Sequence, residues 1–330
     1  MPQAHIIGTG SSVPKRVLSN RDLESIVDTS DKWITRRTGI KDRHISSNSE
    51  HESTTDLGSQ ASIKAMEMAG VSPESLDMII VGTVTPDRQF PSTACMIQKE
   101  LKTDKAFAFD ISAGCSGFLY ALSMANNSIR VGSCKTALIV GVERLSSIIN
   151  WSDRGTCVLL ADGAGAVVVS SEEQKGGILS THLQSDGNLW DLLYSEYGNS
   201  YTPEILTDLD VKPFHLKMEG NRTFKKAVEC LCSIAEKALQ HNSLSHEDIS
   251  LLIPHQANMR IIQAVAKHLG IPMEKVYTNV HKFGNTSSAS IPIALDEANR
   301  AGLIKKGDNV LFIAFGAGLT WASSLVNWSI

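Results

Sequence analysis

The order of strands, helices and glycines in this chain repeats once, and this repeat constrains the fold more than any other feature. Apolar, β-rich runs end at or just before positions about 30 residues apart in each half: Gly82, Cys115 and Gly141, then His255, Asn285 and Gly316. Strands that alternate with helices indicate an α/β fold. A long internal period indicates that one supersecondary unit is used twice. We therefore predict a duplicated α/β fold with halves at residues 1–172 and 173–330.

Hydrophobic spacing predicts the individual elements. The expected strands are 5–9, 78–82, 106–111, 135–142, 164–170, 249–254, 275–279 and 309–315. The expected helices are 56–69, with Thr54 or Thr55 as N-cap, and 91–101, 116–131, 223–238, 259–269 and 287–301. The stretch 194–217 mixes Gly, Asn, Pro, Asp and aromatic residues, which is typical of a loop or a cover over a site.

Composition excludes several classes of protein. Of 330 residues, 42% are hydrophobic and 20% charged, which is enough apolar material for a large core and argues against disorder. The net charge of −4 argues against a protein that mainly coats nucleic acid. No apolar run is long enough for a membrane span and no signal peptide is evident. The six cysteines form no Cys-x-x-Cys pair, so we expect no metal site and a cytoplasmic protein with reduced thiols.

Cys115 is the first candidate for chemistry. It lies in Ala-Gly-Cys-Ser-Gly, between an expected strand and an expected helix. A turn of small residues there exposes the sulfur at a helix N-terminus, where the dipole favours the thiolate and should lower the thiol pKa. An activated nucleophile would result. A buried structural thiol suits the same residues, and on the motif alone both interpretations stay open.

Two polar residues follow strands in the second half. His255 follows Leu-Leu-Ile-Pro, and Asn285 lies in Gly-Asn-Thr-Ser. Open α/β sheets bind ligands at such strand ends, so we expect both side chains to meet Cys115. An ordinary histidine and a helix-capping asparagine are the simpler alternatives. The glycine-rich run 315–321 could offer backbone N–H groups to an oxyanion.

As an ordered set, the motifs of this chain resemble β-ketoacyl-acyl carrier protein synthase III, the initiating condensing enzyme of bacterial fatty acid synthesis. The resemblance covers almost the whole length. Its motifs are Gly8-Thr9-Gly10, Asp31-Lys32-Trp33-Ile34, Arg37-Thr38-Gly39-Ile40, Phe90-Pro91-Ser92, Gly114-Cys115-Ser116-Gly117, Asp153-Arg154-Gly155-Thr156, Asp162-Gly163-Ala164-Gly165-Ala166, Gly220-Asn221, His255-Gln256-Ala257-Asn258 and Gly284-Asn285-Thr286-Ser287. The family has the five-layered α-β-α-β-α thiolase fold, which agrees with the duplication.

The resemblance implies a role for each matching residue. Cys115 would accept the acyl group, while His255 and Asn285 would hold the malonyl thioester and stabilise its enolate. The N–H groups of Cys115 and Ala317 would form the oxyanion hole. Coenzyme A and the substrate would contact Trp33, Arg37, Arg154, Asn221, Phe224, Asn258 and Phe90, of which Phe90 would close the acyl pocket across a dimer. Acyl carrier protein would contact Lys225, Arg260 and Lys267.

The implied reaction is a decarboxylative Claisen condensation of a short acyl-CoA with malonyl-acyl carrier protein, giving 3-oxoacyl-acyl carrier protein, coenzyme A and carbon dioxide. The enzyme would be a homodimer and would need no cofactor, because the coenzyme A thioester is itself a substrate. The stretch 194–217 is longer than in the shorter family members, so the pathway and the starter acyl group stay open. Phe90 favours a short starter.

Rival functions differ in what they require of the sequence. A papain-like protease also orders Cys, His and Asn in this way, but its Cys-Gly-Ser-Cys-Trp signature is missing. A thiolase would need a second cysteine near the C-terminus, and none follows Cys232. A specialised acyltransferase or a quinolone- or polyketide-type synthase on the same scaffold stays open. So does a non-enzymatic acyl-binding module, although binding alone requires no nucleophile.

Overall fold

Two mixed β-sheets organise the chain. The computed structural model describes residues 2–47, 51–172, 175–195 and 215–330. The first sheet has the order β1-β7-β6-β4-β5, formed by Gln3–Ser12, Asp162–Glu172, Thr136–Arg144, Met78–Gly82 and Phe107–Ile111. The first three strands pair antiparallel, and β4 is parallel to both β6 and β5. All five strands lie within the predicted first half, residues 1–172.

The second sheet repeats this arrangement. Its order is β8-β13-β12-β11, formed by Gly177–Ser185, Thr320–Asn327, Asn309–Gly316 and Leu251–Pro254. Here too the first three strands pair antiparallel and the next pairs parallel. A single parallel bridge from Leu252 to Val276 stands where the fifth strand would be. The duplication predicted from the sequence is therefore confirmed, while the exact boundary at residue 172 stays a prediction.

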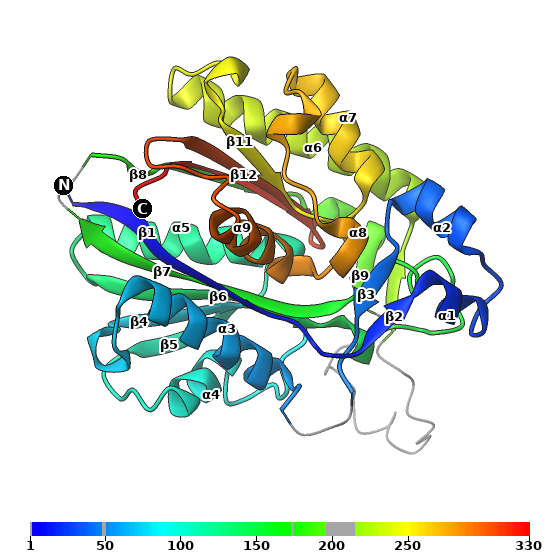
Figure 1. The fold of residues 1–330 in the computed structure, drawn as a ribbon, viewed down its shortest axis with the longest axis horizontal. Coiled ribbons are helices and arrows are strands. Elements are labelled where there is room, and N and C mark those ends of the chain that lie inside the picture. The colour runs from blue at the N-terminus through cyan, green and yellow to red at the C-terminus, as the bar shows by residue number, and fades with distance from the viewer. Residues whose placement is uncertain (1, 48–50, 173–174, 196–214) are drawn as a thin grey trace.

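Helices alternate with the sheets in five layers (Figure 1). The helices α3 (Thr54–Ala69) and α4 (Thr93–Glu100) cover the outer face of the first sheet, and α6 (Gly220–His241) and α7 (Met259–Leu269) cover the outer face of the second. Between the sheets lie α5 (Gly117–Arg130) and α9 (Ser290–Arg300). This is the five-layered fold that the resemblance implied. Because α5 lies between the two sheets, most of its apolar residues are buried, and Met124 is an exposed exception.

Smaller elements gather at one end of the layers, at the right of Figure 1. They are β2 (Val17–Ser19), α1 (Asn20–Glu24), α2 (Asp31–Thr38), β3 (Asp42–His44), α8 (Val280–Phe283) and the pair β9 (Leu193–Ser195) and β10 (Leu216–Met218). The helix α2 begins with its N-cap Ser30 accepting a hydrogen bond from the Trp33 N–H and ends at Gly39 in the left-handed region. These elements bring residues from both halves of the chain to the carboxyl ends of β4, β11 and β12.

Several element predictions were wrong in detail. The strand expected at 275–279 is absent from the described structure, because only Val276 bridges to β11 after the 3₁₀ turn Met273–Lys275. The strands β8 and β13 were missed, since their alternating faces carry Thr, His, Gln and Ser rather than a continuous apolar run. The N-cap of α3 is Ser53, whose hydroxyl forms a capping box with Asp56, and not Thr54 or Thr55.

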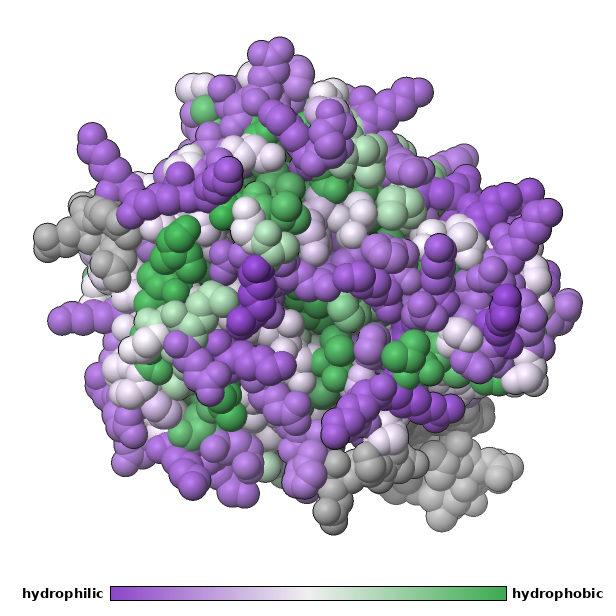
Figure 2. Space-filling view, viewed as in Figure 1, coloured by the Kyte–Doolittle hydropathy of each residue, from purple (hydrophilic) through white to green (hydrophobic). Residues whose placement is uncertain are grey.

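The face of the molecule drawn in Figure 2 is mostly polar. On the face drawn in Figure 2, apolar residues form small separate patches among hydrophilic ones. Within the described ranges, no helix combines the length and the apolar character that crossing a lipid bilayer requires. The apolar side chains are instead collected in the layers between helices and sheets.

Candidate active site

Cys115 lies in the connection between β5 and α5, as the sequence predicted. Gly114 has φ of +52°, a left-handed conformation that favours glycine, and it begins the 3₁₀ turn Gly114–Ser116. The helix α5 follows directly at Gly117. The Ser116 hydroxyl donates to the Thr320 carbonyl, 3.1 Å away, and the Thr320 hydroxyl donates to the Ala113 carbonyl, 2.7 Å away. The turn that carries the sulfur is therefore fixed to β13 of the other half.

The end of β12 packs against the Cys115 backbone. A Cβ atom on Gly316 would lie 2.3 Å from the Cys115 nitrogen, so a side chain at this position is excluded. A Cβ atom on Gly114 would lie 2.7 Å from the Ala317 nitrogen. The amide groups of Cys115 and Ala317 thus belong to two backbone segments in direct contact. Two such N–H donors are the usual components of an oxyanion hole, and only the backbone of residue 317 is required.

His255 follows β11 and is held from two sides. Its backbone N–H donates to the Ile313 carbonyl at 2.8 Å, and its ring Nδ1 lies 2.6 Å from the Ser290 hydroxyl oxygen. The Gln256 N–H donates to the same oxygen at 3.3 Å. The Ser290 hydroxyl can donate its hydrogen to Nδ1, and in that arrangement the ring proton is on Nε2. A neutral imidazole with Nε2–H can donate one hydrogen bond to a substrate.

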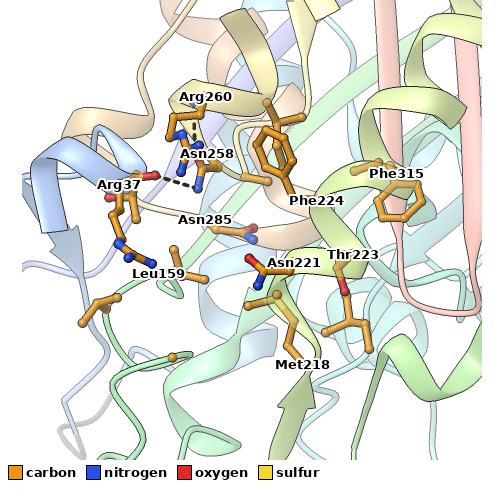
Figure 3. Close-up of a pocket in the computed structure, with 18 of the residues that line it drawn as sticks. Arg37, Leu159, Met218, Asn221, Thr223, Phe224, Asn258, Arg260, Asn285 and Phe315 are labelled. Carbon is orange, nitrogen blue, oxygen red and sulfur yellow. Dashed lines mark hydrogen bonds between the residues drawn. The ribbon is translucent and has the colours of Figure 1, made fainter. Parts of the chain in front are cut away.

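Asn285 is oriented by its own loop. The backbone N–H of Asn285 donates to the Leu159 carbonyl at 2.8 Å, and its carbonyl accepts from the Ala161 N–H at 2.9 Å. Its side-chain oxygen accepts from the Ser287 N–H, 2.8 Å away. With the oxygen engaged, the amide NH₂ is the part of the side chain that can donate into the cavity, which Asn285 lines (Figure 3).

One cavity of about 580 Å³ brings the three predicted residues together. Cys115, His255 and Asn285 all line it. His255 is only 4% exposed, whereas Arg37 and Arg154 in the same lining are exposed. The cavity therefore runs from solvent to a buried end where a thiol, an imidazole and a carboxamide meet. The sequence analysis expected the side chains of Cys115, His255 and Asn285 to lie together, and in the structure all three line the same cavity.

The expected low pKa of Cys115 is contradicted. Burial raises the pKa of the Cys115 thiol to about 12, and the negative charge of Glu143 adds to the rise, while a hydrogen bond from Ser287 works in the opposite direction. The dipole of α5 was expected to dominate, but an ionised sulfur would be poorly solvated here and close to a carboxylate. The resting enzyme therefore holds a thiol, and a proton must leave it before or during attack.

Burial also lowers the pKa of His255, to about 4. The imidazole is therefore neutral at pH 7, a state in which Nδ1 can accept from the Ser290 hydroxyl. A neutral ring can donate from Nε2 to a developing oxyanion without placing an acid next to a carbanion.

The depressed pKa of His255 predicts a loss of stability in acid. The unfolded chain takes up this proton near pH 6.5, while the folded chain resists it until about pH 4. The contribution of the neutral His255 ring to the free energy of unfolding is therefore fully present above pH 6.5. It is lost as the pH falls from 6.5 to about 4, by about 3 kcal/mol in total. We expect a His255→Gln variant to lose less stability between pH 7 and pH 4 than the wild type in urea unfolding. Equal losses in both proteins would contradict the assignment.

The mouth of the cavity is aromatic and cationic. The guanidinium carbons of Arg37 and Arg154 lie 4.9 Å and 5.3 Å from the ring centre of Trp33, and that of Arg260 lies 5.3 Å from the ring centre of Phe224. Arg154 also donates to the Asp28 carbonyl at 2.9 Å. Trp33 thus lies in cation–π contact with two arginines at the mouth of the cavity.

Three further residues that were predicted to contact coenzyme A or the substrate also line the cavity, and one of them has a structural role as well. Asn221 and Asn258 line the cavity, as does Phe224 (Figure 3). The Asn258 side chain caps α7 by accepting from the Arg260 N–H at 2.8 Å, and it donates to the Arg37 carbonyl at 3.2 Å. The capping role of Asn258 was not predicted. Its side chain also joins the helix α2 of the first half to the helix α7 of the second half.

Three predictions concern residues outside the cavity lining. Phe90 is 84% exposed and does not line the cavity within its own described chain. Lys267 is exposed on α7, two turns beyond Arg260, while Lys225 and Arg260 line the mouth. Most of the stretch 194–217 lies outside the described residues.

Sequence reasoning missed three buried polar residues that contact this site. They are Glu143 at the end of β6, Ser287 in the 3₁₀ turn Ser287–Ala289, and Ser290. Glu143 could have been selected from the sequence, because it directly follows the apolar run Leu-Ile-Val-Gly-Val. A charged residue at the end of a buried strand is costly and usually has a function or a partner. The serines carried no comparable signal, since Ser-Ser-Ala-Ser reads equally well as the start of a helix.

Comparison with known proteins places the chain among condensing enzymes. The family described as 3-oxoacyl-[acyl-carrier-protein (ACP)] synthase III matches residues 109–187, and its C-terminal part matches residues 239–328. A β-ketoacyl-[acyl-carrier-protein] synthase III of Caldanaerobacter subterraneus subsp. tengcongensis is 52% identical, covering 99% of this chain and 98% of the relative.

Solved structures agree with this. The synthase III of Aquifex aeolicus has a TM-score of 0.92 at 47% identity, over 98% of this chain and 100% of that one. A priming β-ketosynthase from the R1128 polyketide biosynthetic pathway superposes with a TM-score of 0.93 at 35% identity, over 100% of this chain and 98% of that one.

Proposed function

The chain belongs to the 3-oxoacyl-[acyl-carrier-protein] synthase III family, and from that premise we propose how its residues carry out the reaction. It is an acyl-transferring enzyme of the initiating condensation of fatty acid synthesis. The observation that carries the proposal is the shared cavity of Cys115, His255 and Asn285. Its substrates would be a short acyl-CoA and malonyl-acyl carrier protein, with no further cofactor.

In the first half-reaction, the Cys115 sulfur attacks the thioester carbonyl of the acyl-CoA. The C–S bond to coenzyme A breaks, and the acyl group stays on Cys115. Negative charge develops on the carbonyl oxygen during attack. The adjacent N–H groups of Cys115 and Ala317 are suited to bind that oxygen, because they are fixed on the packed segments around Gly114 and Gly316.

In the second half-reaction, a malonyl thioester enters the same cavity. Its carbonyl oxygen accepts from His255 Nε2–H and from the Asn285 amide, and these donors stabilise the enolate formed as carbon dioxide leaves. The enolate carbon attacks the acyl group and expels the Cys115 thiolate. Donors without a strong acid suit this step, because an acid would protonate the carbanion.

The long entrance suits a coenzyme A arm. Arg37 and Arg154 would neutralise phosphate charge, and Trp33 offers a face for the adenine. Asn221, Asn258 and Phe224 line the intervening path, which matches an amide-containing pantetheine chain in polarity.

Carrier protein would dock on the cationic side of the mouth. Lys225 on α6 and Arg260 on α7 line the entrance, and Lys267 continues the same helix outward. The surface is small and local, which reconciles it with the net charge of −4. Positive charge at the entrance would steer an acidic carrier toward the cavity.

A homodimer would form at the free edge of the first sheet. The strand β5 has no partner on its outer side among the described residues, and its Phe107 and Phe109 are 50% and 38% exposed. Their rings stack with centres 6.4 Å apart. An exposed apolar edge strand favours pairing with a second copy. Phe90, also exposed, is available to enter the partner's acyl pocket.

We expect the double substitution Phe107→Lys with Phe109→Lys to convert the dimer into monomers. Four like charges at a two-fold edge would repel, and apolar area would no longer be buried. Light scattering after size exclusion measures the mass, and Val131→Lys is the control because Val131 is 79% exposed at the far end of α5. A wild-type chain that is monomeric at micromolar concentration would contradict the dimer.

The function is tested by combining the protein with a panel of short acyl-CoAs and malonyl-acyl carrier protein. We expect carbon dioxide, free coenzyme A and a 3-oxoacyl-acyl carrier protein in equal amounts. The panel also identifies the starter group. The specialised-synthase alternative is not favoured, because the relatives at 47–52% identity are β-ketoacyl-[acyl-carrier-protein] synthase III enzymes. It would regain support if free malonyl-CoA served better than the carrier-bound form. The cytoplasmic location stays a prediction.

A further inference from the structure

Gln256 carries a buried amide that the two half-reactions leave without a role. It lies just after β11 and is 1% exposed. Its Nε2 donates to the carbonyls of Pro254 at 2.7 Å and Tyr277 at 3.2 Å. Its Oε1 accepts from the backbone N–H groups of Asn279 at 2.9 Å and Val280 at 3.2 Å. Two carbonyls face one end of the amide and two N–H groups face the other, so its orientation is fixed.

This side chain continues the edge of the second sheet beyond the backbone bridge. The bridge joins Leu252 of β11 to Val276, and the Tyr277 N–H donates to the Leu252 carbonyl at 2.9 Å. The next contacts along this edge are those of the Gln256 amide. It donates to one backbone carbonyl and accepts from backbone N–H groups, as a peptide group of a neighbouring strand does. The amide therefore ties the end of β11 to the segment 277–280.

The segment that Gln256 holds leads directly to Asn285. The two N–H groups that its oxygen accepts belong to the N-cap residue and the first residue of α8. This helix has four residues, and Gly284 at its C-terminal end donates to the Val280 carbonyl at 3.0 Å. Asn285 follows at once. The position of α8 therefore affects where the Asn285 carboxamide lies.

The backbone of Gln256 contacts the support of the other donor. Its N–H donates to the Ser290 hydroxyl oxygen at 3.3 Å, and the same oxygen lies 2.6 Å from His255 Nδ1. His255 is also the preceding residue in the chain. One residue thus joins the group that orients the imidazole to the helix that precedes the carboxamide.

We propose that Gln256 is a positioning residue that sets the spacing between His255 Nε2 and the Asn285 amide, so that both donate to one enolate oxygen. This deepens the proposed function and rests on these two side chains being the enolate donors. The backbones of Leu159 and Ala161 fix Asn285 to the first half, whereas Gln256 fixes it to His255. Two donors must each reach the same oxygen at about 2.7–3.1 Å, so an error of about 1 Å in their spacing weakens one of them.

Gln256→Glu tests the positioning role without changing the size of the side chain. One oxygen can still accept from the N–H groups of Asn279 and Val280. The other replaces the NH₂ group and faces the carbonyls of Pro254 and Tyr277, which repel a carboxylate. A protonated carboxyl can donate to one of these carbonyls, as the amide does.

The two half-reactions of Gln256→Glu are measured separately in single turnovers, between pH 6 and pH 8. At pH 8 we expect condensation to be about 10- to 10²-fold slower than in the wild type, because one enolate donor is displaced. The deficit should shrink toward pH 6, since burial favours the protonated carboxyl. Acyl loading of Cys115 should keep the wild-type rate, because it uses neither donor.

Two further variants separate positioning from a general loss of stability. Gln98→Glu makes the same chemical change on α4, where the Gln98 Nε2 donates to the Ala106 carbonyl at 2.6 Å, and both half-reactions should be unaffected. Gln256→Met removes the donor and the acceptor together, so its condensation deficit should not shrink at low pH. Circular dichroism confirms the fold of each variant. A smaller folded fraction would slow loading and condensation equally.

Equal slowing of loading and condensation in Gln256→Glu, or a condensation deficit that is the same at pH 6 and pH 8, would overturn the positioning role. A wild type that does not condense would instead contradict the proposed function. In that case hydrogen–deuterium exchange of residues 277–285 still decides on Gln256. The exchange should be faster in Gln256→Met than in the wild type and in Gln98→Glu, and equal exchange in all three would refute the proposal.

Discussion

A Cys115→Ala variant is expected to lose acyl loading from every acyl-CoA while keeping its fold. No other described thiol lines the cavity, so the acyl group has no alternative acceptor there. Removing the nucleophile of a covalent enzyme lowers turnover on the order of 10⁶-fold. The loss is measured as the acyl mass increase of the intact protein and as the rate of carbon dioxide release with malonyl-acyl carrier protein.

Cys95→Ala is the matched control. Cys95 is also a free, partly exposed thiol, and its sulfur lies 3.7 Å from the Ala108 carbonyl, away from the cavity. This variant should load and condense at the wild-type rate. Retained loading in Cys115→Ala, or lost loading in Cys95→Ala, would place the chemistry on a different residue.

Asn285→Asp should separate the two half-reactions. Aspartate can still accept the Ser287 N–H through its side-chain oxygen, so the loop is retained, but the amide donor is replaced by an acceptor. Acyl loading should change little. Condensation should slow by about 10²–10³, the usual effect of removing one oxyanion donor.

His255→Ala should show the same split, because its Nε2–H is the second donor to the enolate. Ser290→Ala should slow condensation less than His255→Ala does. It removes the hydrogen-bond partner of Nδ1, so the ring proton is no longer held on Nε2, but the ring itself remains. Quenched-flow measurements of loading and of carbon dioxide release resolve the two steps. If loading fell as much as condensation in Asn285→Asp, the residue would act on the cavity as a whole rather than on the enolate.

The sequence predicted those features that are local along the chain. Cys115 and His255 each follow a strand within a few residues, so position after a strand end was enough to select them. Asn285 was selected by the same rule, although the strand expected at 275–279 is absent from the described structure and the short helix α8 precedes this residue. The repeat of strand ends then predicted two equivalent sheets. Because the two related halves bring the loops at their strand ends to a shared centre, the convergence of side chains from both sheets followed from the duplication.

Properties that depend on tertiary surroundings could not be predicted. The pKa of the Cys115 thiol is raised by burial and by the charge of Glu143, which lies in β6, far from Cys115 in the sequence. The expectation that the helix dipole lowers this pKa was therefore wrong. The contact between Ser287 and Glu143 joins residues from the two halves. The strand β13 was missed because Ser323 and Ser324 are polar but buried by the neighbouring layers.

The central claim is that one sulfur carries the acyl group between two substrates. It is tested by trapping the protein after a single exposure to acyl-CoA, digesting it, and locating the acyl group by mass spectrometry before and after malonyl-acyl carrier protein is added. The account predicts one acyl group per chain, on the peptide that contains Cys115, and its complete transfer to the carrier. An acyl group on any other peptide, or one that stays in place when the carrier arrives, would contradict it.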